Sequence, residues 1–359
     1  MVSRTPTTGT TPAALGFSMP AEWEPHEATW LAWPHNPTDW PDKLDTIRWV
    51  YAEIVRKIAP GETIRMLVNS AAAQKQARRY LTRSGADAGR VEFLIHPTDR
   101  GWTRDSGPIF VRRGSDTAIV HFHFNAWAKY PDWEKDRRVP ERAAKRVGKP
   151  LFDARVDGRE FVLEGGGIDV NGRGTLLTTE ECYLDPEIQV RNPGLGRAGL
   201  EKALEENLGV TNVFWLAGGV AGDDTHGHVD DITRFVGTST IVTVVEPDTT
   251  DPNHAPLAEN LARLKAARTL DGKQFTLVEL PMPRPVVFRG QRLPASYANF
   301  YIANDLVLAP TFHDPSDRVA LNILAEVFLD REVIGIHAVD LVWGLGTLHC
   351  MTQQQPAVL

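Results

Sequence analysis

Hydrophobic residues recur along the chain with two different spacings, which predict alternating helices and strands. In residues 45–58 apolar side chains recur every three to four positions, from Ile47 to Ile58, and Pro60-Gly61 ends the pattern. Similar patterns predict helices over residues 71–84, 138–147, 196–208, 256–268 and 316–330. Short apolar or β-branched runs predict strands over residues 63–69, 91–96, 117–124, 175–179, 211–217, 238–245, 274–280 and 305–310.

Strands that alternate with single helices, without a long linker, indicate one α/β domain built of repeated strand–helix units. We expect a disordered leader over residues 1–17, because this stretch lacks an apolar core, and a single domain over residues 18–359. Four tryptophans between Met19 and Pro41 predict a core edge or an interface. No internal repeat is evident. The first strands carry no glycine-rich nucleotide-binding motif, so nucleotide binding has no support.

Composition narrows the class of protein further. A net charge of -7 over 359 residues argues against nucleic acid as a partner, since polyanions select basic surfaces. No apolar run approaches the roughly 20 residues of a membrane span, so we expect no membrane partner. Only two cysteines occur, Cys182 and Cys350, which excludes a disulfide framework. We therefore expect a cytoplasmic protein.

Four segments combine glycine with ionisable or nucleophilic residues on loops between the predicted elements: 102–108, 164–167, 224–231 and 344–350. Taken singly, each has an ordinary explanation. Asp105 could form a turn, the glycines after Glu164 a tight bend, and Cys350 a small buried apolar residue. Cys182 has the same explanation as Cys350, and its acidic neighbours raise a thiol's pKa, so it is the weaker candidate for a nucleophile.

Residues 226–231 also suggest an alternative of another class, a metal-dependent hydrolase. In an extended strand, His226, His228 and Asp230 would share one face, as at the start of a binuclear metal-hydrolase motif. Such a site needs further ligands downstream. The later histidines stand in unrelated contexts, so the pattern favours this alternative only weakly.

Together, the segments contain the groups that attack on a guanidinium carbon requires. A guanidinium is planar and cationic, and carboxylates bind its donors in pairs. Its carbon is a poor electrophile, so the reaction needs a strong nucleophile such as a thiolate and an acid for the departing amine. The charge of the substrate would favour the thiolate, and a histidine could serve both half-reactions. This chemistry needs no metal or organic cofactor.

The order of the motifs resembles the agmatine deiminase and bacterial-type peptidylarginine deiminase family of the guanidine-modifying superfamily. The resemblance extends from about residue 18 to 356 and rests on seven motifs: Met-Pro-Ala-Glu-Trp-Glu-Pro-His at 19–26, Trp-x-Arg-Asp-x-Gly-Pro at 102–108, Glu-Gly-Gly-Gly at 164–167, Leu-Leu-Thr-Thr-Glu-Glu-Cys at 176–182, Gly-His-Val-Asp-Asp at 227–231, Tyr-Ala-Asn-Phe-Tyr at 297–301 and His-Cys-Met-Thr-Gln-Gln at 349–354.

This resemblance implies a fold and a set of roles. The fold would be a five-bladed pseudosymmetric α/β propeller (pentein) of ββαβ units around a substrate tunnel. Cys350 would be the nucleophile and His228 the general acid and base, with Glu164 orienting His228. The remaining residues would bind substrate: Asp105 and Asp230 at the guanidinium, Trp102 near it, and Asp224 at the far end. An S-alkylthiouronium intermediate would be hydrolysed to an N-carbamoyl product and ammonia.

The substrate is less certain than the reaction class, because two segments depart from the agmatine deiminase pattern. This chain has Gly-Leu-Gly-Thr-Leu-His-Cys at 344–350 and Asp-Asp-Thr-His-Gly-His at 223–228, where agmatine deiminases commonly have Gly-Gly-Gly-Asn-Ile-His-Cys and Glu-x-Thr-Asn-Gly-His. Agmatine, a precursor of putrescine and the polyamines, remains the first candidate. Arginine, peptidyl-arginine and another guanidino metabolite are the alternatives, and homo-oligomerisation is left open. A site selective for agmatine should offer an acid such as Asp224 at its far end and no cation there.

Overall fold

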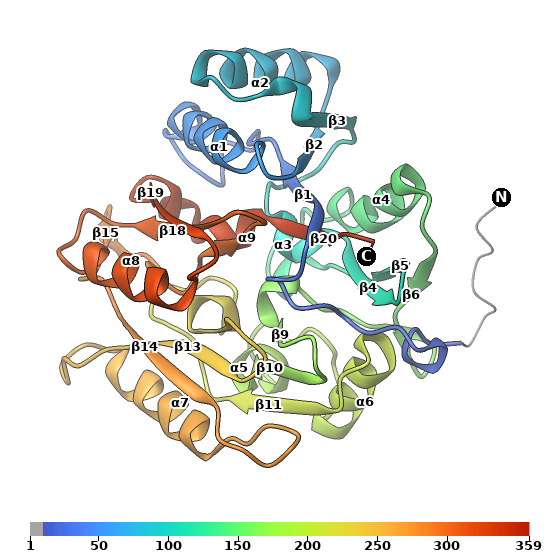
Figure 1. Ribbon diagram of the computed structural model, residues 1–359, viewed down its shortest axis with the longest axis vertical. Helices are drawn as coiled ribbons and strands as arrows, with labels where there is room; N and C mark the ends of the chain where they lie inside the picture. Colours follow the sequence, from blue (N-terminus) through green and yellow to red (C-terminus); the bar gives the residue numbers. More distant parts are fainter. Residues whose placement is uncertain (1–9, 359) are drawn as a thin grey trace.

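The computed structural model describes residues 10–358, which form a mixed α/β fold of small sheets flanked by helices (Figure 1). Every helix and strand that the hydrophobic pattern predicts is present, with ends that differ by no more than three residues. The predicted helices are α1 (Leu44–Ile58), α2 (Ala71–Ser84), α4 (Val139–Val147), α6 (Arg197–Leu208), α7 (His254–Ala266) and α8 (Ser316–Val327). None of the described helices is long and apolar enough to cross a membrane.

Four of the sheets share one strand pattern. The middle strand pairs antiparallel with the strand before it and parallel with the strand after it, and a helix connects the parallel pair, because a tight hairpin cannot. These sheets are β4 (Ile109–Arg113), β5 (Asp116–His121) and β6 (Leu151–Asp153); β9 (Asp169–Val170), β10 (Thr175–Thr179) and β11 (Asn212–Leu216); β12 (Thr233–Phe235), β13 (Thr240–Val245) and β14 (Thr276–Pro281); and β17 (Tyr301–Ile302), β18 (Leu306–Thr311) and β19 (Glu332–His337).

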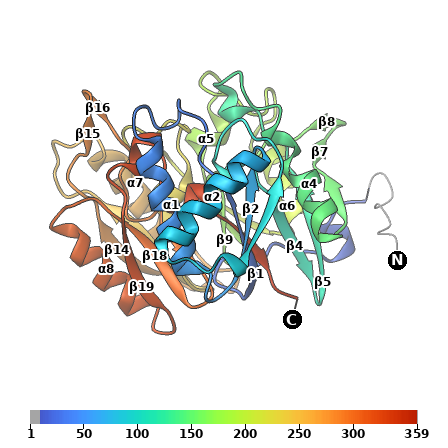
Figure 2. The ribbon, with the colours of Figure 1, turned by 90° about the horizontal axis from the view of Figure 1, so that it is seen from above.

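Two hairpins lie outside these sheets. They are β7 (Arg155–Val156) with β8 (Arg159–Glu160), and β15 (Val287–Phe288) with β16 (Gln291–Arg292), and both lie at the upper side of Figure 2. Gln291 of β16 contributes to the wall of the cavity described below.

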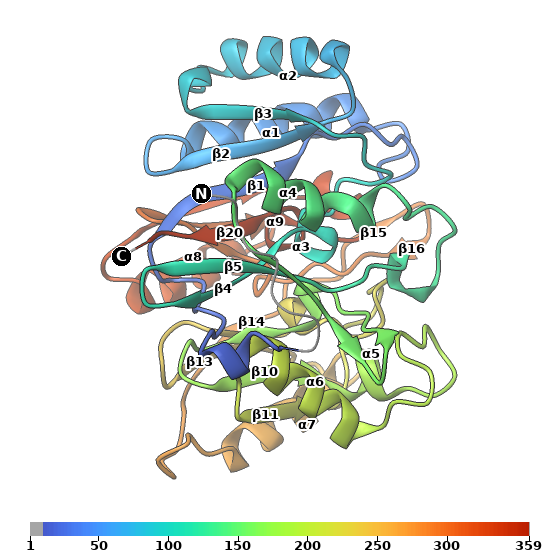
Figure 3. The ribbon, with the colours of Figure 1, turned by 90° about the vertical axis from the view of Figure 1, so that its right-hand side faces the viewer.

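A four-stranded sheet combines three strands from the N-terminal part of the described chain with one from its C-terminal part (Figure 3). Its order is β20 (Gln353–Pro356), β1 (His26–Ala32), β2 (Thr63–Val68) and β3 (Val91–Ile95), and β20 runs antiparallel to β1. The three glutamines of β20 are buried, and two of them accept side-chain hydrogen bonds: Trp30 Nε1 donates to Gln355 at 3.0 Å and Arg104 Nη1 donates to Gln354 at 2.7 Å. This polar strand holds the residues just before it, including Cys350, in the centre of the fold.

The tryptophans near the N-terminus belong to the core itself rather than to its edge alone. Trp30, Trp33 and Trp40 are buried, and their indole N–H groups have hydrogen-bond acceptors. Trp40 also packs against Trp102, with ring centroids 5.0 Å apart. The core is therefore continuous with the wall of the cavity that Trp102 lines.

The expected leader over residues 1–17 ends too late. A 3-10 helix, η1 (Ala13–Leu15), precedes Phe17, which is buried and packs edge-on against Phe152 at a centroid distance of 5.9 Å. The single aromatic residue after a polar, threonine-rich stretch anchors this segment to the core, which the composition of the stretch did not reveal. Residues 1–9 lie outside the described part of the chain.

Four short helical turns each precede a strand that pairs antiparallel with its neighbour in a sheet. They are α3 (Thr103–Ser106) before β4, η5 (Gly165–Gly167) before β9, η6 (Val229–Asp231) before β12, and α9 (Leu348–Met351) before β20. α3 contacts both α9 and η5, and η5 contacts η6. In Figure 1 the long helices lie toward the outside, whereas α3 and α9 lie nearer the middle. Equivalent turns from distant parts of the sequence thus converge.

Candidate active site

Cys350 lies in α9 and is only 6% exposed. Its sulfur accepts a hydrogen bond from Asn299 Nδ2 at 3.1 Å, and Asp230 Oδ2 lies 3.7 Å from the sulfur. Asn299 lies two residues before β17. Its side-chain oxygen also accepts hydrogen bonds from Thr347 Oγ1 at 2.8 Å and from the His349 N–H at 3.0 Å. One buried amide therefore fixes the loop that carries the thiol.

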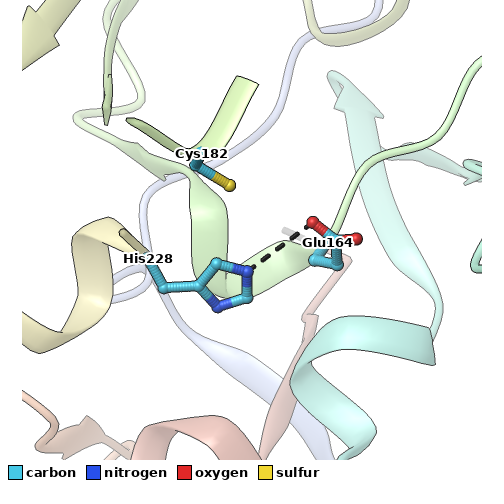
Figure 4. Close-up of side chains that lie close together, drawn as sticks. All are labelled: Glu164, Cys182 and His228. Atoms are coloured by element: carbon cyan, nitrogen blue, oxygen red, sulfur yellow. Dashed lines mark ion pairs between the residues drawn. The ribbon is translucent and has the colours of Figure 1, made fainter. Parts of the chain in front are cut away.

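His228 lies fully buried between two carboxylates. Its Nδ1 is 3.7 Å from Asp105 Oδ1 and its Nε2 is 3.6 Å from Glu164 Oε2 (Figure 4). Neither ring nitrogen has a hydrogen-bond partner among the described residues. Burial alone would lower the pKa of His228, but the charge of Asp105 and contacts with Cys182 and Glu164 hold this pKa well above its usual value. His228 is therefore an imidazolium with protons available for a bound molecule.

Glu164 is held as a carboxylate facing His228. Arg191 Nε lies 3.3 Å from both of its oxygens, and Tyr183 Oη donates to Glu164 Oε2 at 3.4 Å. Burial would raise the pKa of Glu164, but Arg191 and His228 hold it below its usual value. The negative charge of Glu164 stabilises the imidazolium of His228.

Cys182, in α5 (Glu180–Leu184), lies beside the same histidine. Its sulfur, one carboxylate oxygen of Glu164 and a ring nitrogen of His228 all lie within 4.8 Å of one another (Figure 4). No local pattern in the sequence places Cys182 beside His228, because the motifs that carry the two residues are separated along the chain. The fold brings them together.

Asp105 and Asp230 supply the acceptors at the centre of the site. Trp127 Nε1 donates to Asp105 Oδ2 and the Gly166 N–H donates to Asp105 Oδ1, both at 3.0 Å. Asp230 Oδ2 lies 2.7 Å from His349 Nδ1, but Asp230 Oδ1 is buried without a partner in the described chain. Because buried acceptors are almost always satisfied, this oxygen indicates a donor that the protein itself does not provide.

These groups lie at the inner end of a cavity of about 210 Å³. Cys350 and Asp105 form part of its surface, Trp102 and Trp127 are aromatic walls, and Asp224 lies on it as well. His228, Asp230 and Glu164 lie behind this surface. Aromatic faces together with carboxylates suit a flat cation, which stacks on the rings while its N–H groups bind the acids.

The far end of the cavity differs from the expectation that no cation lies there. Lys129 Nζ is 2.6 Å from Asp224 Oδ1, and Tyr130 Oη donates to Asp224 Oδ2 at 2.6 Å. The expectation was wrong because Lys129 lies nearly a hundred residues before Asp224 and only the fold brings them together.

Gly166 lies where the two acids and the histidine meet. A Cβ at this position would be 2.6 Å from His228 Nδ1, 2.8 Å from Asp105 Oδ1 and 3.1 Å from Asp230 Oδ2. We therefore expect Gly166→Ala to lower kcat/KM by ~100-fold or more, because displacement of reacting groups by about 1 Å costs that much. Gly196→Ala is the control, since a Cβ there meets nothing within 4 Å. Equal activities of the two folded variants would contradict this account of the site.

The three ligands of the alternative metal site do not converge. His226 turns toward α5, with Nε2 2.9 Å from Asp185 Oδ2 and Nδ1 3.4 Å from Glu181 Oε1. Among the described residues, the groups of three with ligand atoms within 4.8 Å are Glu164–Cys182–His228 and Asp230–Asp231–Cys350. The segment forms a turn with His226 at φ 63°, not an extended strand, so the predicted shared face does not exist.

All seven site residues predicted from the sequence lie on the cavity or directly behind it. The sequence indicated Cys182 only as the weaker candidate for a nucleophile, and it did not single out Trp127, Arg191, Asn299 or His349. All five hold or contact the predicted residues. Asn299 and His349 lie inside recognised motifs, so a signal existed for them. Trp127 and Arg191 lie outside every motif.

Comparison with known proteins identifies the family of the chain. Residues 18–356 match the model of the Porphyromonas-type peptidyl-arginine deiminase family. An agmatine deiminase of Stutzerimonas stutzeri (strain A1501) is 36% identical over 372 residues, covering 97% of each chain. The structure of the agmatine deiminase of Enterococcus faecalis is similar at a TM-score of 0.91 and 29% identity, over 99% of this chain and 100% of that one. A C. jejuni agmatine deiminase, solved with substrate bound, is similar at a TM-score of 0.85 and 30% identity, over 96% and 97%. The chain belongs to the Porphyromonas-type peptidyl-arginine deiminase family.

Proposed function

We propose that this protein hydrolyses agmatine to N-carbamoylputrescine and ammonia through a covalent intermediate on Cys350. The observation that carries the proposal is the convergence of the Cys350 thiol, the acids Asp105 and Asp230, and a buried imidazolium at the inner end of one cavity. The names of the similar proteins, agmatine deiminases of three organisms, favour agmatine among guanidino substrates.

The substrate's guanidinium would lie between the aromatic walls and the two acids. Asp230 Oδ1, which lacks a partner, and Asp105 would accept its N–H groups, and Trp102 and Trp127 would cover its faces. The guanidinium charge would then offset the negative charges that Asp105 and Asp230 place beside the thiol. A neutral or anionic ligand would leave those charges uncompensated, so the site selects cations.

Binding of this cation would also activate the nucleophile. Burial raises the pKa of the Cys350 thiol well above its usual value, and the charges of Asp230, Asp231 and Asp105 raise it further. The empty site therefore holds a neutral thiol. A guanidinium beside the sulfur adds the opposite charge and favours the thiolate. The enzyme would thus become reactive only with substrate in place.

The reaction then proceeds in two halves. As substrate binds, the Cys350 thiol releases its proton to solvent. The thiolate attacks the guanidinium carbon, and the His228 imidazolium gives its proton to the departing amino group, which leaves as ammonia. The product of this half is an S-alkylthiouronium on Cys350 and a neutral His228. His228 takes one proton from water as the oxygen attacks the same carbon. The second proton of that water passes to the departing sulfur as the C–S bond breaks, and the carbamoyl product leaves. Water and agmatine balance the two products, and both side chains are regenerated.

The repeated sheets support a finer description of the fold. Four sheets share the ββαβ pattern, and the sheet of β20, β1, β2 and β3 has the same antiparallel and parallel pairs around β1. We infer that these five units form a five-bladed propeller within a single catalytic domain, with the site at the turns that precede their first strands. Free thiols at Cys182 and Cys350 fit a cytoplasmic location.

The fall of kcat/KM at low pH should follow the protonation of Asp105. Burial raises the pKa of Asp105 to about 6; His228 opposes this rise, and Asp230 and Glu164 add to it. The ionised carboxylate binds the guanidinium, so kcat/KM should fall roughly tenfold per pH unit as the pH drops through and below this value. The guanidinium itself stays charged throughout. A kcat/KM that stays constant between about pH 5 and 7, with the protein folded, would contradict this assignment.

Substrate choice is tested by comparing agmatine, arginine, arginine peptides and guanidinobutyrate for ureido product and for ammonia released without an added acceptor. Asp224 would repel the α-carboxylate of arginine, so we expect agmatine to exceed arginine in kcat/KM by at least ~10-fold. Asp224→Asn should narrow this ratio, mainly through KM. If arginine or a peptide is the better substrate, agmatine is the wrong substrate and the deiminase chemistry stands. Turnover that requires an acceptor amine would indicate an amidinotransferase instead.

A further inference from the structure

The ion pair at the far end of the cavity has a consequence for substrate selection, which rests on the proposed function. Asp224 lies on the cavity surface, and both of its carboxylate oxygens already have partners, Lys129 and Tyr130. The Lys129 side chain is 40% exposed and that of Asp224 is 20% exposed. The lysine can therefore leave the carboxylate for solvent, whereas Asp224 remains fixed at the cavity wall.

The turn that carries Lys129 connects both ends of the cavity. Ala126, Trp127 and Ala128 have φ values of 51°, 59° and 53°, a left-handed conformation that non-glycine residues rarely adopt. Hydrogen bonds hold this turn: Asn125 Oδ1 accepts from the Ala128 N–H at 2.9 Å, and Gln189 Nε2 donates at 3.1 Å to both the Trp127 and the Asp224 carbonyls.

The same turn therefore places Trp127 against Asp105 at the inner end and Lys129 against Asp224 at the outer end. The backbone of Lys129 is fixed by these bonds, so its ammonium is tethered within reach of Asp224 even when another cation displaces it.

Arg100, another cation near the outer end, already has partners of its own. Arg100 lies on the cavity, but its guanidinium binds Asp39 at 2.8 Å and Asp132 at 2.9 Å and stacks on the Tyr130 ring at 4.2 Å. In the described chain, Lys129 is the cation that pairs with Asp224. The ammonium of Lys129 has the same chemistry as the distal ammonium of agmatine, so the two would compete for one carboxylate.

We propose that Lys129 is a tethered competitor for the distal group of the substrate and thereby sets selectivity for the charge at that position. A substrate with a distal ammonium must displace Lys129 from Asp224. A substrate with an uncharged tail leaves the ion pair intact. A substrate with a distal carboxylate gains from Lys129 a partner that offsets the repulsion from Asp224.

The test compares the unaltered enzyme with Lys129→Gln on three guanidines of similar length: agmatine, n-butylguanidine and guanidinobutyrate. Exposed ion pairs contribute little, so we expect kcat/KM for agmatine to rise about two- to fivefold, through a lower KM, once the competitor is removed. The value for n-butylguanidine should stay unchanged, and that for guanidinobutyrate should fall about two- to fivefold. Raising the salt concentration should reduce the difference in kcat/KM for agmatine between the unaltered enzyme and Lys129→Gln.

Lys135→Gln is the matched control, because Lys135 Nζ forms a similar pair with Asp99 at 2.6 Å, and Asp99, unlike Asp224, does not line the cavity. This variant should leave all three substrates unchanged. If Lys129→Gln shifts all three substrates by one factor, or leaves the ratio of agmatine to n-butylguanidine unaltered, the inference is overturned while the proposed function stands. If the unaltered enzyme converts none of the three, the proposed function fails and the inference with it.

Discussion

Replacement of Cys350 by serine should lower kcat for agmatine by ~10,000-fold or more while the protein remains folded. The serine hydroxyl keeps the size of the side chain, and Asn299 can still donate to it, so the loop that carries residue 350 should be preserved. A hydroxyl is a far weaker nucleophile than a thiolate near neutral pH. A guanidinium charge that suffices to ionise a thiol does not ionise an alcohol. The measurement is carbamoyl product formed per enzyme, together with the melting temperature.

The control for this prediction makes the same change at the other buried cysteine. Cys182→Ser should keep most of the activity, because a hydroxyl keeps a small polar group beside His228 and takes no covalent part in the reaction. If instead Cys182→Ser abolishes turnover and Cys350→Ser retains it, the roles of the two thiols are reversed and the mechanism is wrong.

Asp105→Asn and Asp230→Asn should each lose at least ~3 kcal/mol of transition-state stabilisation, read from kcat/KM. Each substitution keeps the shape of the side chain but removes a charge that faces the guanidinium in a buried site. It also introduces an amide N–H that would point at another donor. Asp230→Asn should have the larger effect, since Asp230 also lies 3.7 Å from the Cys350 sulfur and 2.7 Å from His349.

Asp231→Asn offers a matched control beside Asp230. Burial and the charges of Asp230 and Asp223 raise the pKa of Asp231 well above its usual value, which favours its protonated form. Asparagine is a close substitute for a protonated aspartate, and its oxygen can still accept from Asn299. We expect a loss below about tenfold. Near-normal kcat/KM in both Asp105→Asn and Asp230→Asn would place the guanidinium site elsewhere.

The hydrophobic pattern predicted the elements whose burial follows a regular period. α1 and α2 have one apolar face each, and β10 and β13 are apolar runs between polar loops. The pattern missed β20, because its Gln353–Gln355 run is polar, although Gln354 and Gln355 are buried with hydrogen bonds from Arg104 and Trp30. It also missed the short turns that carry the site, since four residues cannot show a helical period.

The site residues were predictable where motifs named them and not where only the fold brings them together. Asp105, Glu164, His228, Asp230 and Cys350 stand in motifs, and each lies in or next to the turn before a first strand. The repetition of that turn is visible in the sheets but not in the sequence, because each copy carries a different functional residue. The contacts of Cys182 with His228 and of Lys129 with Asp224 depend on the packing of separate units, which no local pattern encodes.

Mass analysis of Cys350 during a single turnover tests the central claim most directly. Enzyme in excess over agmatine is quenched with acid at successive times and digested. The masses of its two cysteine-containing peptides are then measured. The covalent mechanism predicts that the Cys350 peptide transiently gains the mass of agmatine less one molecule of ammonia, and that the gain disappears as N-carbamoylputrescine forms. Product formation with the Cys350 peptide unmodified at every time, or with the added mass on the Cys182 peptide, would contradict it.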